Sequence, residues 1–168
     1  MVVVCAKEVA ALGSTVFLFV APGTVVVLLP WWLTGWRSGD WWPALRAAGL
    51  VPLIAGAVVL LSAYVRFVVE GLGTPAPVAP PEHLVVGGLY RYLRNPMYVA
   101  VIAAIAGQGL LLARPVLFAY GACAGVAMWA FAKGYEEPAL TRRFGAGYVR
   151  YRQGVPGWRP RLTPWRDD

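Results

Sequence analysis

The amino-acid sequence predicts an all-α fold: an integral membrane four-helix transmembrane bundle followed by a C-terminal amphipathic helix on the cytoplasmic side. Hydrophobic residues make up 59% of the 168 residues and charged residues only 14%, whereas soluble domains are about 45–50% apolar and about 25% charged. The apolar residues are concentrated in four long runs. No run alternates with a period of two, which disfavours membrane-spanning strands. We interpret residues 1–168 as one membrane domain.

The four apolar runs are long enough for membrane-spanning helices, which need about 20 mostly apolar residues, with about 17 as the lower end. The predicted spans cover about residues 9–29, 45–69, 97–113 and 116–132. Only Arg114-Pro115 separates the last two, so these predict a tight antiparallel hairpin. Both of its helices carry small residues four positions apart, which would allow close approach, namely Ala103 with Gly107 and Gly121 with Gly125.

Positive charge is distributed unevenly along the chain, whose formal net charge is +7. With four spans, the N-terminus, residues 70–96 and the C-terminal tail share one side of the membrane and carry most of the Lys and Arg residues. The positive-inside rule then places both termini in the cytoplasm. We expect a multi-pass protein of a bacterial or archaeal cytoplasmic membrane, whose basic tail contacts anionic lipids. This contact accounts for the charge without a nucleic-acid partner.

Metal and disulfide sites are not predicted. The two cysteines, Cys5 and Cys123, are far apart in the sequence, and His83 is the one histidine. This set cannot supply the usual ligands of a zinc site. We interpret both cysteines as structural thiols.

The first polar block of the sequence opens the third predicted span. Residues 71–81 contain four prolines and predict an extended strap, which would deliver His83 and the segment 84–98 to the cytoplasmic end of that span. One interpretation of Arg94-Asn95-Pro96 is a proline-initiated helix with a snorkelling arginine. The other is a ligand pocket in which the Asn95 amide and the Tyr98 hydroxyl are polar contacts.

The second polar block follows the fourth predicted span and begins with Glu136 and Glu137. These residues form either a solvated helix cap or a site in which one carboxylate faces inward toward a cationic group while the other caps the helix. Pro138 is tolerated at the start of a helix, so we expect a new amphipathic helix over about residues 138–153. Its apolar side would present Leu140, Phe144, Tyr148 and Tyr151.

Together the two blocks resemble the isoprenylcysteine carboxyl methyltransferase family, which is similar in its C-terminal half to the phospholipid N-methyltransferases. The first block of that family is matched here by Leu84, Val85, Gly88, Tyr90, Arg94, Asn95, Pro96 and Tyr98. The second block is matched by Glu136, Glu137, Leu140, Phe144, Gly145, Tyr148 and Tyr151. The resemblance covers about residues 71–162. At position 95 this chain has asparagine, as the phospholipid enzymes do, whereas the prenylcysteine enzymes have histidine at the matching position.

The resemblance implies S-adenosylmethionine-dependent methyl transfer to a lipophilic acceptor that reaches the cytoplasmic interface from the bilayer. It implies Glu136 and Tyr98 as catalytic residues, and a cofactor site lined by His83, Leu84, Val85, Gly88, Tyr90, Arg94, Asn95, Pro96, Tyr98, Glu136 and Glu137. The acceptor is left open between a prenylcysteine-like carboxylate and a lipid amine or thiol. An ammonium acceptor would first have to lose a proton, for which Glu136 or His83 is a candidate base.

The alternative function is that of a non-catalytic membrane protein, which would bind a lipid or a partner helix at its cytoplasmic interface. Binding of S-adenosylhomocysteine, lost when Glu136 or Asn95 is replaced, would distinguish the enzyme from this alternative.

Overall fold

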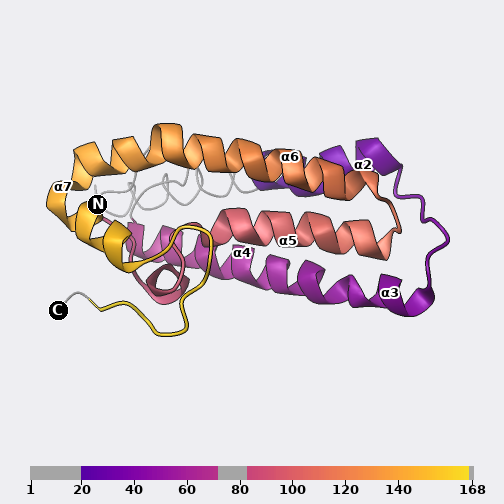
Figure 1. The fold of residues 1–168 in the computed structure, drawn as a ribbon, viewed down its shortest axis with the longest axis horizontal. Coiled ribbons are helices and arrows are strands. Elements are labelled where there is room, and N and C mark those ends of the chain that lie inside the picture. Colours follow the sequence, from indigo (N-terminus) through magenta and orange to yellow (C-terminus); the bar gives the residue numbers. More distant parts are fainter. Residues whose placement is uncertain (1–19, 72–82, 167–168) are drawn as a thin grey trace, which may run out of the picture.

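The computed structural model describes residues 20–71 and 83–166, and this part of the chain contains helices and no strand, as predicted. Figure 1 shows the arrangement of these helices. Their bounds are Thr24–Leu28 for the π-helix η1, Leu29–Thr34 for α2, Pro43–Ala48 for α3, Leu50–Gly71 for α4, Gly88–Arg91 for the 3-10 helix η2, Pro96–Leu111 for α5, Val116–Phe131 for α6, Ala132–Glu136 for the π-helix η3 and Glu137–Gly154 for α7.

The long helices α4, α5 and α6 run side by side, with α3 prolonging α4 (Figure 1). One end of this layer holds η2, the start of α5, α7 and the tail as far as residue 166, and we call it the polar end. The opposite end holds the α5–α6 turn and residues 35–42. The two blocks of polar residues therefore meet at one end of the molecule, although most of α5 and α6 lies between them in the sequence.

The first described helix runs from Val20 to Thr34, whereas the predicted span covers residues 9–29, of which 9–19 lie outside the described residues. The helix continues past Pro30 because a π-helical turn precedes this proline. Proline has no N–H to offer to the preceding turn. Side chains of the hairpin supply donors instead: Gln108 Nε2 to the Val26 carbonyl and Tyr120 Oη to the Val25 carbonyl, both at 2.8 Å.

The second predicted span, residues 45–69, corresponds to α3 and α4, which are joined at Gly49. Gly49 lies against α5 so closely that a β-carbon at this position would be 2.6 Å from the Gly107 carbonyl oxygen. A β-carbon at Gly56 would likewise be 2.6 Å from the Ala100 carbonyl oxygen. The contact between α4 and α5 is therefore a close backbone approach of the kind that small residues permit.

The predicted hairpin of residues 97–113 and 116–132 is confirmed as α5 and α6, within one or two residues at most ends. Helix α5 ends in a Schellman turn, in which the Arg114 N–H donates to the Gly109 carbonyl at 3.0 Å and Ala113 takes the left-handed conformation at φ 52°. Pro115 is the N-cap residue of α6. The two-residue break seen in the sequence is the tip of this turn.

The small residues of the hairpin serve two different interfaces. Gly121 and Gly125 of α6 face the side chains of Ile105 and Ile102 on α5, as predicted. Gly107, in contrast, faces α4, since a β-carbon there would lie 2.6 Å from the Leu53 backbone nitrogen. The prediction that Gly107 serves the hairpin is therefore wrong, because this residue lies on the face of α5 that α4 covers.

The predicted helix over about residues 138–153 is confirmed as α7 (Glu137–Gly154), but the expected break before it is absent. The chain stays helical from α6 through η3 into α7, and Pro138 follows a π-helical turn just as Pro30 does. The wider turn removes the conflict between the proline ring and the preceding carbonyl that would break a regular α-helix. The break falls at Gly145 instead, where φ is 54° and ψ is −130°, values that glycine adopts readily.

Two of the described helices are long and apolar enough to cross a membrane, Pro43–Ala63 and the long helix that begins at Val116. The apolar helices Val20–Thr34 and Pro96–Leu111 are shorter. The 16 residues of α5 rise about 24 Å, which is less than the ~30 Å of a bilayer's hydrocarbon core. The structure thus confirms a helical protein with two candidate spans, and the four-span bundle stays a prediction.

The close approach of α4 and α5 makes Gly107 sensitive to one added methyl group. We expect Gly107→Ala to lower stability by about 1–3 kcal/mol because backbone must move, which corresponds to a fall of roughly 2–4 °C in the thermal midpoint per kcal/mol. Gly23→Ala is the matched control, since its β-carbon would meet nothing within 4 Å. Thermal unfolding in detergent measures both; equal midpoints would contradict the close approach.

Candidate functional site

The residues that precede α5 form a compact turn against α4. Gly88 takes the left-handed conformation at φ 54°, and a β-carbon there would lie 2.9 Å from the Arg66 Nε, so both the backbone and the space favour glycine. Val85 and Tyr90 are buried against Ala63. These two predicted cofactor residues therefore face the protein core with their side chains.

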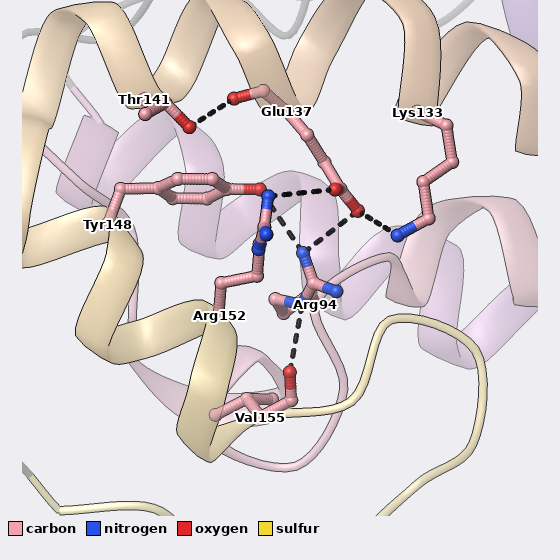
Figure 2. Close-up of polar contacts among 7 residues, drawn as sticks. All are labelled: Arg94, Lys133, Glu137, Thr141, Tyr148, Arg152 and Val155. Carbon is pink, nitrogen blue, oxygen red and sulfur yellow. Dashed lines mark hydrogen bonds and ion pairs between the residues drawn. The ribbon is translucent and has the colours of Figure 1, made fainter.

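Arg94 connects three segments of the polar end. Its Nε donates to the Val155 carbonyl at 2.8 Å, and its Nη1 donates to Glu137 Oε1 at 3.1 Å and to the Tyr148 hydroxyl at 3.2 Å. Its backbone N–H also donates to the Pro156 carbonyl at 3.0 Å. The arginine thus joins the start of α5 to α7 and to the tail that follows α7 (Figure 2).

Glu137 is 7% exposed and lies among three cationic side chains (Figure 2). Lys133 Nζ is 2.9 Å away, Arg94 Nη1 3.1 Å and Arg152 Nη1 3.4 Å. Burial raises the pKa of Glu137, but Lys133 and Arg94 lower it more strongly, so the pKa lies below its ordinary value. The carboxylate is charged at neutral pH and its charge is fully compensated within the protein.

Glu136, one residue earlier, has a different environment. Its Oε1 accepts a hydrogen bond from the Tyr98 hydroxyl at 2.6 Å, and it forms no ion pair within the part of the chain that the structure describes. Burial raises the pKa of Glu136, the bond from Tyr98 opposes this, and the charge of Glu137 adds to it, so the pKa lies above its ordinary value. The pKa values of these two adjacent carboxyl groups are therefore shifted in opposite directions.

The helical path explains why adjacent glutamates have different partners. Successive residues of an α-helix are about 100° apart around the axis, so Glu136 and Glu137 point in different directions where η3 passes into α7. Glu136 faces α5 at Tyr98 and Glu137 faces Arg94. Glu136, the N-cap residue of α7, makes no side-chain capping hydrogen bond, because the chain is already helical through η3. The prediction that one glutamate caps a helix is therefore wrong.

The second half of α7 folds back at Gly145 and covers the turn before α5. The Tyr151 hydroxyl donates to the Tyr90 carbonyl at 2.6 Å. Around it lies an aromatic cluster consisting of Tyr148, Tyr151 and Val155, with Leu84, Val86, Leu140, Phe144 and Trp165 packed against it. The predicted apolar side of residues 138–153 is thus real, but the kink at Gly145 is needed to bring its members together.

The other predicted site residues are placed as follows. His83 is exposed, and Leu84 is partly buried against the aromatic cluster. Asn95 precedes α5 and is partly buried, and its side chain makes no capping hydrogen bond. Pro96 is buried in the first turn of α5. The predicted strap lies outside the described residues except for its first residue, Gly71.

Sequence reasoning missed three residues of this site. Lys133 pairs with Glu137 at the helical spacing of four residues, a signal that was hidden because a helix break was expected between them. Arg152 reaches the same carboxylate from the second half of α7. Trp158 stacks on Tyr98, with ring centroids 6.0 Å apart and an interplanar angle of 13°. A tryptophan within an arginine-rich tail was the available signal for this last contact.

The arrangement suits a cationic ligand. Glu137 is neutralised by the protein's own cations, whereas the partly buried carboxyl group of Glu136 has the Tyr98 phenol as its one side-chain partner among the described residues. Because this carboxyl group is already partly removed from water, binding a cation there costs little further desolvation. The amide of Asn95, the residue before α5, offers donors and an acceptor.

The fold and this site define a helical protein with two candidate membrane spans, in which two polar blocks meet at the end of a hairpin. The family model for phospholipid methyltransferase matches residues 45–147, more than half of the chain, and the chain belongs to this family. The predicted resemblance is thereby confirmed at the level of the family, and the chain is a membrane methyltransferase of this kind. No curated protein and no solved structure matches the chain significantly.

Removing the charge of Glu137 should weaken the polar end. Breaking a buried ion pair from one side costs about 3 kcal/mol, so we expect Glu137→Gln to lower the thermal midpoint at pH 7. Because the pKa of Glu137 is lowered in the folded state, its charge stabilises the folded protein at pH values above the unfolded-state pKa. This contribution is lost as the pH falls. The difference in thermal midpoint between Glu137→Gln and the unsubstituted protein should therefore become smaller below about pH 4.3.

Arg152→Ala is the control for this prediction. It removes a cation from the same carboxylate, but the Arg152 side chain is 49% exposed, and an exposed pair contributes about 0–1 kcal/mol. Thermal unfolding at several pH values compares the two variants. Equal losses, or a Glu137→Gln effect that persists unchanged at low pH, would contradict the buried-pair interpretation.

Proposed function

We propose that the chain is an S-adenosylmethionine-dependent methyltransferase that methylates a membrane lipid at the cytoplasmic interface, with the Tyr98–Glu136 pair at its centre. The observation that carries this proposal is the 2.6 Å hydrogen bond between Tyr98 and Glu136. It joins the two polar blocks, which are 38 residues apart in the sequence. Membership of the phospholipid methyltransferase family supports methyl transfer as the chemistry.

The residues present fit this cofactor. S-adenosylmethionine would supply a methyl group on a positively charged sulfur, and it also carries an ammonium group. Glu136 is the carboxyl group of the polar end that remains without a cationic partner among the described residues, and it would hold one of these charges. The partly buried Asn95 amide would offer polar contacts, as the sequence blocks imply.

Positioning is the main contribution that such a site makes to methyl transfer. An in-line displacement needs donor and acceptor held together with water excluded, and proximity of this kind can supply about 7–11 kcal/mol. In this proposal Tyr98 orients the Glu136 carboxyl group. Arg94 and Glu137, which are engaged with each other, hold α5, α7 and the tail in register and act as positioning residues.

The acceptor we propose is a lipid amine. An ammonium group must lose its proton before it can attack the methyl carbon. The raised pKa of Glu136 makes this carboxylate a better proton acceptor than an ordinary glutamate. His83 is exposed and no described contact joins it to the Tyr98–Glu136 pair, so Glu136 is the base that we favour. Carboxylate and thiol acceptors, which need no strong base, are the other outcomes of the test.

A lipophilic acceptor is supported by an apolar groove between α5 and α6. It has a volume of about 290 Å³ and is lined by Ile102, Ala106, Leu117, Phe118, Gly121, Ala122 and Gly125. Ile102 is one helical turn beyond Tyr98 on α5, so it lies on the same face of that helix. The groove would hold an acyl or prenyl chain whose polar head lies at the Tyr98–Glu136 pair.

Cofactor binding is tested by calorimetry of the detergent-purified protein with S-adenosylhomocysteine. We expect Glu136→Gln to weaken binding at least tenfold, since a charge-assisted hydrogen bond to the ligand ammonium is worth about 1.5–3 kcal/mol. Asp40→Asn makes the same chemical change at the opposite end of the molecule, where Asp40 is exposed, and should leave binding unchanged. No binding to the unsubstituted protein at millimolar ligand would sink the proposal.

The groove is tested with a labelled-methyl transfer assay against extracted membrane lipids and prenylcysteine analogues. Ala122→Leu would fill the groove, and we expect it to lower transfer to long-chain acceptors about tenfold while S-adenosylhomocysteine affinity stays the same. Ala119→Leu is the matched control, because Ala119 is exposed on α6 and does not line the groove. Equal activity of the two variants would exclude the groove as the chain site.

A further inference from the structure

Trp158 belongs to the tail that follows α7, yet it contacts Tyr98 of the first polar block. Its indole ring is stacked on Tyr98 at 6.0 Å, and Tyr98 is in turn bonded to Glu136. The indole of Trp158 therefore contacts the phenol of Tyr98, and this phenol contacts the carboxyl group of Glu136. Trp158 also lies beyond residues 45–147, the part of the chain that the family model matches.

The backbone around Trp158 is fixed from both sides. Arg94 binds the carbonyls of Val155 and Pro156 before it, and the Arg161 N–H donates to the Tyr92 carbonyl at 3.0 Å after it. Gly157 is buried against the start of α5, where a β-carbon would be 3.2 Å from the Arg94 Nη2. The tryptophan is thus presented to Tyr98 by a segment that fits closely to the first polar block.

The Trp158 indole N–H is a buried donor that has no hydrogen-bond partner among the residues that the structure describes. Buried polar groups are almost always paired, and an unpaired one calls for a specific explanation. Replacing tryptophan by phenylalanine would keep the stacked ring and remove this donor. An unsatisfied donor on the ring that is stacked on Tyr98, the partner of Glu136, is the feature that points to a ligand.

We propose that Trp158 is a ligand-binding residue of this site, whose indole N–H donates a hydrogen bond to an acceptor atom of the bound S-adenosyl cofactor. The inference rests on the proposed function and extends the site into the tail. In this proposal the Trp158 ring covers Tyr98 at the site, and its N–H donates to an oxygen or nitrogen atom of the cofactor. Glu136 holds the positive charge of the same molecule.

The test compares Trp158→Phe with the unsubstituted protein by calorimetry with S-adenosylhomocysteine. We expect about a tenfold loss of affinity, the effect of one hydrogen bond, which equals about 1.4 kcal/mol, at an unchanged thermal midpoint. Trp129→Phe is the matched control, since Trp129 is 52% exposed on α6, and it should bind as the unsubstituted protein does.

A second measurement follows ligand binding in the unsubstituted protein. In protein labelled with ¹⁵N-tryptophan, the Trp158 indole N–H resonance, identified by its absence in Trp158→Phe, should move downfield when S-adenosylhomocysteine is added. A folded Trp158→Phe protein that binds as tightly as the unsubstituted protein, or an indole resonance that does not move, would overturn the inference while leaving the proposed function standing. Failure of the unsubstituted protein to bind would overturn both.

Discussion

The buried ion pair between Arg94 and Glu137 is the interaction on which the polar end depends. The arginine side chain is 10% exposed and that of the glutamate 9%, and through Arg94 the pair also reaches Tyr148 and Val155. Such a pair adds little net stability over apolar packing, so its importance is geometric. It fixes the rotation of α7 about its axis, and this rotation decides which of the two glutamates faces α5.

Much of the fold could be predicted because it is encoded locally. The length and apolarity of α5 and α6 and the break at Arg114-Pro115 predicted the hairpin almost residue by residue. Pro138 misled the same reasoning, since proline ordinarily marks a helix boundary, and the first described helix likewise continues past Pro30. Both prolines follow π-helical turns, and in the first helix the extra donors come from distant side chains. This tertiary compensation has no signature within a short sequence window.

The candidate site was predictable as a set of residues but not in the roles of its members. The spacing within the two blocks was enough to expect that they meet, and Tyr98 and Glu136 do. Glu136 faces Tyr98 and Glu137 faces Arg94 because the helix is uninterrupted there, which the sequence did not indicate. Trp158 lies outside both blocks, and its place beside Tyr98 results from tail contacts that are made through backbone carbonyls of any residue type.

The docking of the tail has a consequence for biosynthesis. Arg94 binds the carbonyl of a residue 61 positions later, and Arg91 that of a residue 74 positions later, Trp165. During translation the apolar helices leave the ribosome well before these residues of the tail have been made. The contacts of the polar end therefore form only after residue 165 has been made, so a polypeptide that stops before the tail would keep its apolar helices but lack the partners of Arg91 and Arg94.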